Sequence, residues 1–209
     1  MLEVTGIYLI IGVMAVIIFY PLAWAIGLSL NSGTSLYSSS IIPKNPTLEH
    51  YRWLFTSPDS NYLTWYRNTL YVSTLNSLLS VVFTSMTAYA LSRFDFYGRK
   101  SGMYAFLLLQ MFPVMMAMVA IYIFLNLIGL LNTLIGLVLI YAGGQIPFNA
   151  WLVKGYMDTI SRELDDAAKI DGAGPIRVFI RILLPLIAPI LSIVALTNFM
   201  LPIFDFILH

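Results

Sequence analysis

Five long stretches of this 209-residue sequence contain almost no charged residue, and they limit the kind of fold that is open to the chain. They cover residues of about 7–30, 69–92, 102–125, 133–153 and 182–209. A helix needs about 20 mainly apolar residues to cross the hydrocarbon core of a bilayer, and each stretch is long enough. Lipid offers peptide groups no hydrogen bonds, so a chain crosses it as helices or as a closed barrel. The sequence therefore predicts an all-α polytopic membrane protein with five visible transmembrane helices.

The composition agrees with this class and excludes several others. Hydrophobic residues make up 59% of the chain and charged residues 10%, whereas a soluble domain carries about 25% charged residues. A net charge of +1 and the lack of any run of Lys and Arg argue against a nucleic-acid binder. The chain has no Cys and only 2 His, so it offers no set of metal ligands.

The positions of the 11 Lys and Arg residues predict the orientation of the chain. Most of them lie in the breaks after the second and fourth stretches: Arg93, Arg99, Lys100, Lys154, Arg162, Lys169, Arg177 and Arg181. Cytoplasmic loops carry the excess of Lys and Arg, so we expect the N-terminus inside and the loop 31–67 outside. The last stretch reaches His209 without a basic anchor or a polar tail, which we interpret as a fragment that lacks a sixth span.

Polar side chains within the second stretch recur at steps of three or four residues. They are Thr69, Ser73, Asn76, Ser80, Thr84 and Thr87. This spacing places them on one face of a helix, and that face is expected to avoid lipid. Two interpretations remain open, namely hydrogen bonding between helices and direct contact with a substrate.

The third and fourth stretches contain residues that interrupt regular helix. Gln110 and Pro113 lie in the third; Gly143, Gly144, Gln145, Pro147 and Asn149 lie in the fourth. Proline removes a backbone hydrogen bond and paired glycines permit bending, so we expect hinges or broken helices near a translocation path. An ordinary kinked bundle is the alternative.

The loop 31–67 is rich in aromatic residues, including Trp53, Trp65 and Tyr66. Tyr and Trp favour the headgroup level of a membrane, which makes interface anchoring one interpretation. A docking surface for an external partner is the other.

Charge is concentrated in the break 154–181. Ser161 is placed to cap a short helix from Glu163 to Ile170 whose first turn is acidic, as the helix dipole favours. Gly172 is expected to stop this helix, and Pro175 suits the first turn of the next one. The pattern predicts a short helix, a sharp turn and a helix that re-enters the membrane, although a plain solvated loop fits the same charges.

The residues of this loop resemble a known sequence motif. Asp166-Ala167-Ala168, three residues, Gly172, nine residues and Ile182-Leu183-Leu184-Pro185 resemble the Glu-Ala-Ala loop of ATP-binding-cassette importer permeases. Asp166 departs from the usual Glu, keeping the charge on a shorter side chain. Further segments resemble the carbohydrate branch, the maltose-type second permease: Ala88–Phe94, Gly98–Lys100, Gln110–Pro113, Ile146–Trp151 and Lys169–Ala173.

This resemblance implies a permease subunit in a bacterial or archaeal cell membrane, with six spans in the family. The implied partners are a homologous second permease, two ATP-binding cassette ATPase subunits and an extracytoplasmic sugar-binding protein. ATP and Mg would be bound by the ATPase, which agrees with the absence here of a Gly-x4-Gly-Lys-Ser/Thr phosphate loop. The residues implied in ATPase coupling are Glu163, Asp166, Ala167, Ala168, Asp171, Gly172, Leu184 and Pro185.

The resemblance also implies a sugar as substrate, of maltodextrin or galacto-oligosaccharide type. Amides that can hydrogen-bond sugar hydroxyls are candidates for the substrate path: Asn76, Gln110, Gln145 and Asn149. A secondary transporter is the first rival class, but apart from the terminal Asp205 no ionisable residue for ion coupling lies mid-span. A structural membrane subunit is the second, and it leaves the motif spacing unexplained. An enzyme is the third, and the sequence offers it no clustered carboxylates or His-based triad.

Overall fold

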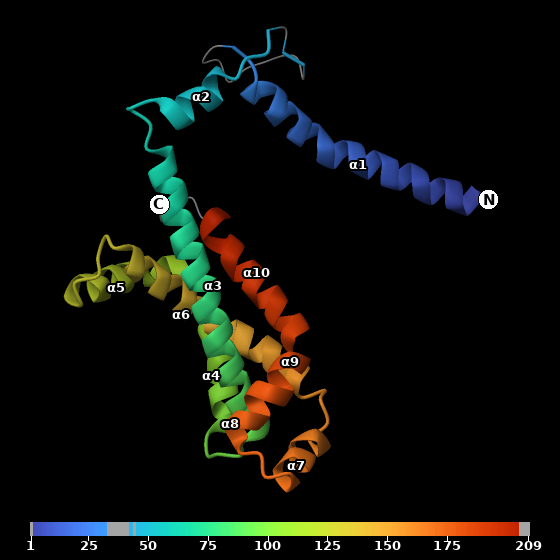
Figure 1. Cartoon of the computed structure of the whole chain (residues 1–209), viewed down its shortest axis with the longest axis vertical. Helices are drawn as coiled ribbons and strands as arrows, with labels where there is room; N and C mark the ends of the chain where they lie inside the picture. Colours follow the sequence, from blue (N-terminus) through green and yellow to red (C-terminus); the bar gives the residue numbers. More distant parts are fainter. Residues whose placement is uncertain (1, 33–41, 44, 205–209) are drawn as a thin grey trace. The chain divides into compact units, whose positions relative to one another are not determined.

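The computed structural model describes residues 2–32, 42–43 and 45–204. The chain divides into two compact units, Met1–Tyr66 and Arg67–His209, each of which is described by itself. Within the described residues every regular element is a helix, which confirms the predicted all-α class (Figure 1).

The described residues of the first unit form one long apolar helix, one short helix and the start of a third. Helix α1 (Leu2–Ser29) corresponds to the first predicted stretch, and none of the residues in its most apolar segment is buried. Helix α2 (Glu49–Thr56) is tied to the end of α1, because the hydroxyls of Ser29 and Tyr51 lie 2.7 Å apart. The His50 ring also lies within hydrogen-bond distance, 3.0 Å, of the Asn31 carbonyl. In this unit the predicted loop 31–67 is therefore partly helical.

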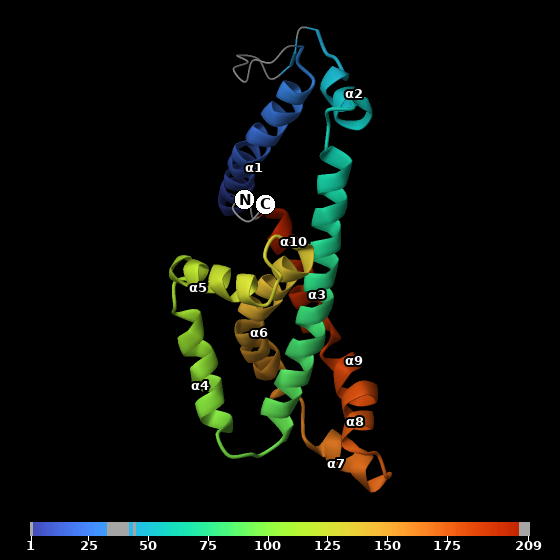
Figure 2. The ribbon, with the colours of Figure 1, turned by 90° about the vertical axis from the view of Figure 1, so that its left-hand side faces the viewer.

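The second unit contains the remaining helices and the end of α3, which begins in the first unit. They are α3 (Tyr62–Arg93), α4 (Arg99–Gln110), α5 (Val114–Leu127), α6 (Leu134–Met157), α7 (Glu163–Ile170), α8 (Pro175–Val178), the π-helix η1 (Phe179–Leu183), α9 (Leu184–Leu186) and α10 (Ala188–Phe204). Figures 1 and 2 show the α3–α4 loop and α7 at the same end of this unit. The two loops rich in Lys and Arg thus share one end.

Three helices in the described residues are long and apolar enough to cross a membrane, namely Val4–Ser29, Tyr62–Arg93 and Leu134–Met157. They match the first, second and fourth predicted stretches. The fifth stretch begins in a bent pair, Pro175–Leu186 and Ala188–Phe204, with 77° between the two parts. Residues 205–209 of that stretch lie outside the described residues.

The third predicted stretch, 102–125, is two helices rather than one. Helix α4 ends at Gln110, and Pro113 adopts an extended conformation (φ −63°, ψ 120°) before α5 begins. Proline disfavours the helical conformation in the residue before it, which accounts for the break and confirms the expected interruption here. The interruption expected at Pro147 is absent, because α6 runs unbroken through that residue.

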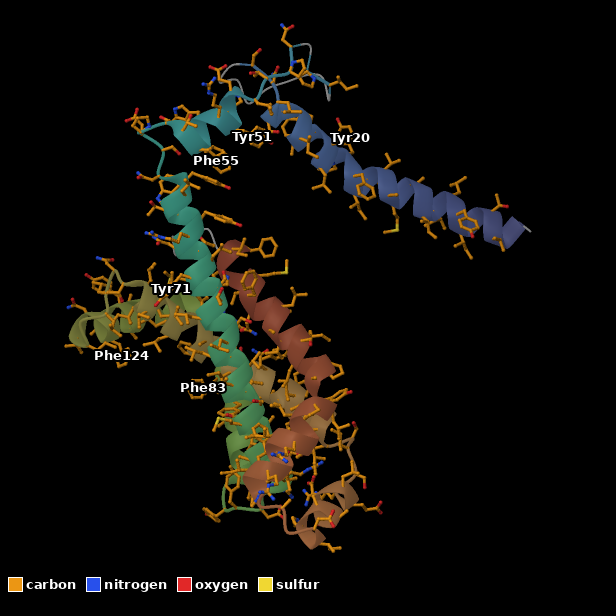
Figure 3. All side chains as sticks on the ribbon, viewed as in Figure 1. Tyr20, Tyr51, Phe55, Tyr71, Phe83 and Phe124 are labelled. Atoms are coloured by element: carbon orange, nitrogen blue, oxygen red, sulfur yellow. The ribbon has the colours of Figure 1, made fainter. Side chains whose placement is uncertain are left out.

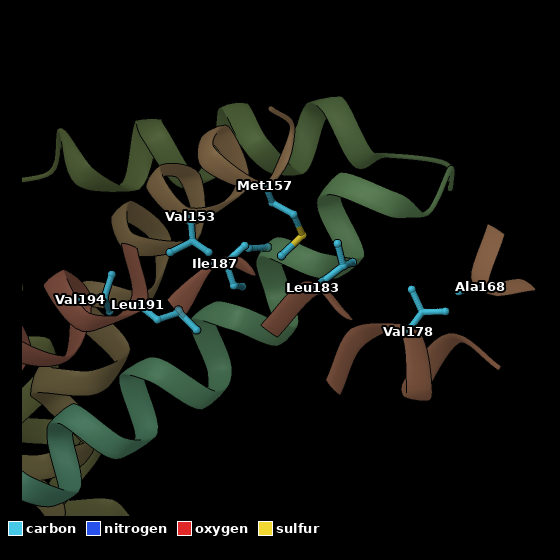
Figure 4. Packing of buried hydrophobic residues seen from close by; sticks show 9 residues of the cluster. Val153, Met157, Ala168, Val178, Leu183, Ile187, Leu191 and Val194 are labelled. Carbon is cyan, nitrogen blue, oxygen red and sulfur yellow. The ribbon is translucent and has the colours of Figure 1, made fainter. Parts of the chain in front are cut away.

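Helices α3, α6 and α10 enclose the main core together with the segment from α7 to α9. Its buried residues are Ala88, Val153, Met157, Ala168, Val178, Leu183, Ile187, Leu191 and Val194. Figure 4 shows Met157, Leu183 and Ile187 beside one another. A second, smaller cluster joins Val72 of α3 to Val138 and Tyr141 of α6. The contacts of the main core fix the end of the unit where α7 lies.

Many large apolar side chains lie on the outside of the helices. Tyr71 and Phe83 of α3 and Phe124 of α5 extend away from their helices (Figure 3) and are about half exposed or more. A soluble protein rarely leaves so much apolar surface open, whereas lipid or a partner helix covers it at no cost.

Candidate functional site

Helix α7 has the bounds that the sequence predicted, Glu163–Ile170. The Ser161 hydroxyl accepts a hydrogen bond from the Glu163 N–H at 3.2 Å, although Arg162 rather than Ser161 occupies the cap position. Gly172 has φ +78°, which favours glycine, and ends the helix. The Ala173 N–H donates to the Ala168 carbonyl and the Gly172 N–H to the Lys169 carbonyl, so the last carbonyls are satisfied in a Schellman turn.

One face of α7 is turned outward. Its exposed residues include Glu163, Asp166, Ala167 and Asp171 of the predicted coupling set, and Gly172 follows in the exposed turn. Ile170 is the most open apolar residue of the helix, with 87% of its surface exposed. The outward face therefore combines carboxylates with small and apolar side chains, a surface suited to a groove on another protein.

Ala168 lies on the opposite face. It is only 7% exposed and faces Val178 of α8 at one end of the core cluster (Figure 4). The prediction that Ala168 contacts an ATPase does not fit this geometry, because the chain itself covers the methyl group. Ala168 packs α7 against α8, and a larger side chain there would separate the two helices.

A buried ion pair holds the inward face of α7 to α3. Arg93 Nε lies 2.6 Å from Asp165 Oδ2, and the side chains are 6% and 8% exposed. Arg93 Nη2 also donates to the Ile160 carbonyl at 3.0 Å. The sequence shows both charges, but it does not predict that Arg93 and Asp165 pair. Asp165 and Ala168 are three residues apart and share a face, but periodicity alone does not say which face turns inward.

Three arginines gather at the carboxyl end of α3. Arg99 donates to the Leu91 carbonyl at 2.6 Å and to the Ser92 carbonyl at 3.2 Å, and Arg162 donates to the Ser92 carbonyl at 2.8 Å. Arg93 completes the group. Cations are favoured at this end of a helix because its last carbonyls lack intrahelical donors. The arginines join α3 to α4 and to the start of α7.

Tyr89 links α3 to the start of α8. Its hydroxyl donates to the Pro175 carbonyl at 3.0 Å, and its ring stacks on Phe179 with centroids 4.8 Å apart. Both ends of the α7 turn are thus attached to α3, one through Arg93 and the other through Tyr89. Displacing α7 must move α3 or break these contacts.

Leu184 and Pro185 of the predicted set lie between α7 and α10. Pro185 has no N–H to donate to the carbonyl of Arg181, four residues earlier, and its ring would clash with that carbonyl. The chain widens into the π-helix η1 immediately before it, with the Leu184 N–H bonded to the Phe179 carbonyl. Leu184 is partly buried against the core, and Pro185 is exposed.

Two ion pairs outside the membrane-spanning part lower carboxylate pKa values. A hydrogen bond from Lys169 lowers the pKa of the exposed Asp166 and raises that of Lys169. Burial raises the pKa of Asp158, but hydrogen bonds from Lys154 and from Ser92 (2.6 Å) outweigh it, so that this pKa lies below its usual value. Both carboxylates are therefore charged at neutral pH.

The polar face of α3 is turned into the helix bundle. Ser73, Asn76, Ser80 and Thr84 are fully buried. Asn76 Nδ2 donates to the Asn198 carbonyl of α10 at 2.6 Å, and the Ser77 hydroxyl donates to the Ala195 carbonyl at 2.8 Å. Of the two interpretations of this face, hydrogen bonding between helices is the one that the structure displays.

The other amide candidates differ in their surroundings. Gln110 donates to the Gly144 carbonyl at 3.1 Å and joins the end of α4 to α6. Gln145 is partly exposed on α6. Asn149 is 4% exposed, and its Nδ2 finds no acceptor among the described residues. Gln110 and Gln145 therefore lie near one another on α4 and α6, apart from the buried Asn76.

No group of His, Asp and Glu suited to a metal ion occurs in the part of the chain that the structure describes. The arrangement instead offers a short helix that is anchored on one face and open on the other. A displacement of this helix can be passed to α3, because the Arg93–Asp165 ion pair joins its inward face to α3.

Comparison with known proteins identifies a family and two similar relatives. The sequence profile of the family described as "Binding-protein-dependent transport system inner membrane component" matches residues 80–208. The chain is 47% identical over 202 residues to the galactooligosaccharides transport system permease protein GanQ of Bacillus subtilis, covering 96% of this chain and 71% of GanQ. It is 41% identical over 201 residues to the maltodextrin transport system permease protein MdxG of the same organism, covering 96% and 72%.

A solved structure has the same fold. It is a chain from a bacterial ABC transporter involved in the import of the acidic polysaccharide alginate, with a TM-score of 0.81 and 23% sequence identity. The likeness covers 96% of this chain and 71% of that chain.

Proposed function

The chain belongs to the family of binding-protein-dependent transport system inner membrane components, and we propose that it helps to import an oligosaccharide into the cell. It is a permease subunit of an ATP-binding-cassette transporter, embedded in the membrane. The relatives GanQ and MdxG are named for galactooligosaccharides and maltodextrin, which favours a short glucan or galactan as substrate. Family membership favours a transport subunit over the rival classes of secondary transporter, structural subunit and enzyme.

The proposed assembly contains four further components. A second, homologous permease completes the translocation path, two ATPase subunits bind ATP and Mg, and an external binding protein delivers the sugar. Support comes from the open apolar surface of α3 and α5 and from the outward face of α7. The two Lys- and Arg-rich loops at one end of the second unit support a cytoplasmic position for α7 and an N-terminus inside.

The observation that carries the coupling proposal is the two-sided character of α7. Its outward residues Glu163, Asp166, Ala167 and Asp171 insert into a cleft of the ATPase, while Asp165 and Ala168 hold it to the permease. When the ATPase dimer closes, α7 moves. The displacement passes through Arg93 and Tyr89 to α3, and through Leu184 and Pro185 to α10. Helices α3 and α10 are joined by Asn76, so they move together.

The proposed sugar contacts are Gln110, Gln145 and Asn149. Gln145 is partly exposed, and Asn149 carries an amide N–H with no acceptor in the described chain. We assign Asn76 to the helix interface, because its amide is already bonded and fully buried.

The coupling proposal is tested at Gly172 in the reconstituted transporter, by measuring ATP hydrolysis stimulated by the loaded binding protein. Gly172→Asp places a β-carbon at φ +78° and a charge behind the docking face, so stimulated hydrolysis and transport are expected to fall at least tenfold while membrane insertion persists. Gly174→Ala is the matched control, since Gly174 has φ −71° and open space around it. Normal stimulated hydrolysis in Gly172→Asp would overturn the proposal.

The substrate is tested separately, by uptake of labelled galacto-oligosaccharides and maltodextrins into proteoliposomes that hold the complete transporter. Saturable, ATP-dependent uptake of either sugar supports the proposal. Uptake of neither, with active uptake of a different class of solute, excludes an oligosaccharide.

A further inference from the structure

A pocket between α4 and α6 contains none of the residues proposed to contact the sugar or the ATPase. It has a volume of about 740 Å³ and is lined by the α3–α4 loop, the first turns of α4 and two residues of α6. Helix α4 packs on α6 along this side (Figure 2). The pocket lies at the end of the second unit where the Lys- and Arg-rich loops meet, and hence at the level of a membrane surface.

The charge around this pocket is mainly positive. Arg99, Lys100 and Lys154 line it, with Asp95 as the one carboxylate in the lining. Arg99 is fixed by the carbonyls at the end of α3 and pairs with Asp95, whose side chain is 80% exposed. Lys154 pairs with Asp158. Lys100 is exposed and has no acceptor among the described residues, so it is the cation available to a ligand.

The remaining wall is apolar and aromatic. Tyr104 and Trp151 line the pocket together with Met103 and Leu107. Tyr104 is 66% exposed, and Leu108, one helical turn further along α4, is equally open. Tyr and Trp favour the level of lipid headgroups, and an open apolar helix face beyond them suits an acyl chain. A ligand that fits must carry an anionic group and an apolar tail.

We propose that this pocket binds an anionic phospholipid of the cytoplasmic leaflet, with its phosphate on Lys100 and its acyl chain along Met103, Tyr104 and Leu107. Arg99 supplies a fixed positive field, and Trp151 covers the glycerol region. Basic pockets between membrane helices at the cytoplasmic side are suited to such headgroups. The leaflet depends on the proposed orientation, whereas the site itself depends only on membrane embedding and on the side chains named here.

The test uses the complete transporter purified in a neutral detergent and titrated with dioleoylphosphatidylglycerol or dioleoylphosphatidylcholine, with bound lipids counted by native mass spectrometry. We expect the anionic lipid to bind in preference to the zwitterionic one. A cation near a membrane surface contributes about fivefold to the binding of an anionic lipid, so Lys100→Gln is expected to lower the apparent affinity about fivefold. Lys100→Arg is expected to restore it.

Arg67→Gln is the matched control. Arg67 is an exposed cation near the opposite end of α3, and its removal changes the net charge equally. Equal binding of the two lipids, or the same loss in Arg67→Gln as in Lys100→Gln, would overturn the proposal. So would displacement of the anionic lipid by millimolar inorganic phosphate, which would show a site for free anions. Because no sugar or ATP is needed, failure here is distinct from failure of the transport proposal.

Discussion

Asp165 is the residue through which α7 is held to α3. Its carboxylate lies against Arg93 in a site where both side chains are less than a tenth exposed. Removing one partner of a buried ion pair leaves the other charge uncompensated, at a cost of about 3 to 5 kcal/mol. We expect this loss of unfolding free energy in Asp165→Asn, together with faster amide exchange throughout α7, measured by denaturant unfolding and by hydrogen exchange.

Asp171→Asn serves as the control for this measurement, because Asp171 is exposed at the end of the same helix and is expected to change stability by no more than about 0.5 kcal/mol. The double variant Arg93→Met with Asp165→Leu replaces the pair by apolar groups and is expected to recover much of the stability. Equal stability of Asp165→Asn and the parent protein would show that the pair does not hold α7.

Asp158 gives the same end of the molecule a dependence on pH. Hydrogen bonds from Lys154 and Ser92 depress its pKa in the folded state, so the stability it contributes is present above the unfolded pKa of about 3.9 and is lost as pH falls through the lower folded value. We expect the difference in thermal unfolding temperature between the parent and Asp158→Asn to be constant from neutral pH to about pH 4 and to shrink below it. A difference that shrinks already between pH 7 and pH 5 would contradict this assignment.

Pro185 controls the geometry of the segment that connects α7 to α10. The π-helix before it exists because the proline can neither donate to the Arg181 carbonyl nor approach it. Pro185→Ala removes both restrictions and lets η1 relax to an α-helix, which rotates α8 relative to α10. We expect ATP hydrolysis to persist and the amount of sugar transported per ATP to fall about two- to fivefold in proteoliposomes, since transition between packed states depends on the register of the connecting helix.

Pro189→Ala is the control, because Pro189 lies in the first turn of α10, where proline is tolerated and its loss frees no constraint. The two variants are to be compared in proteoliposomes of the same composition. An unchanged ratio of transport to hydrolysis in Pro185→Ala would show that the π-helix plays no part in coupling.

The same elements explain how far the sequence predicts the structure. The bounds of α7 and the break at Pro113 depend on local signals, namely Ser161, Gly172 and the proline itself, so they were predicted correctly. The uninterrupted course of α6 through Pro147 was not, since neighbouring helices can stabilise a helix that contains proline. The bend after Leu186 was also missed.

The sequence likewise predicts only part of the candidate site. The resemblance to the motif predicts which residues of α7 take part in coupling, but the Arg93–Asp165 pair joins distant parts of the sequence and depends on how α3 and α7 pack. The inward position of Ala168 has the same cause, because the motif does not say which side of the helix packs on the permease. Helical periodicity defines faces, whereas tertiary packing decides what each face contacts.

Across the whole molecule, the scarcity of charge and its concentration at one end of the second unit have the same physical cause. Charged groups are costly in the hydrocarbon core, so they gather where the chain meets water. In the second unit that place holds the α3–α4 loop, α7 and the turn after it (Figures 1 and 2). The surface proposed to contact an ATPase and the pocket proposed for a phospholipid therefore lie near one another.

The orientation that this requires can be tested on the chain itself, because it contains no Cys and each introduced thiol is unique within it. We expect Asp59→Cys, in the loop before α3, to react with a membrane-impermeant maleimide in intact cells. Tyr97→Cys, at a fully exposed position of the α3–α4 loop, is expected to react only after the membrane is permeabilised. The physical reason is the excess of Lys and Arg around Tyr97, which favours a cytoplasmic position for that loop. Asn126→Cys, near the end of α5, provides a second external position and should behave as Asp59→Cys does. The reverse labelling pattern would place α7 outside, out of reach of any ATPase, and would overturn the coupling mechanism as well as the orientation.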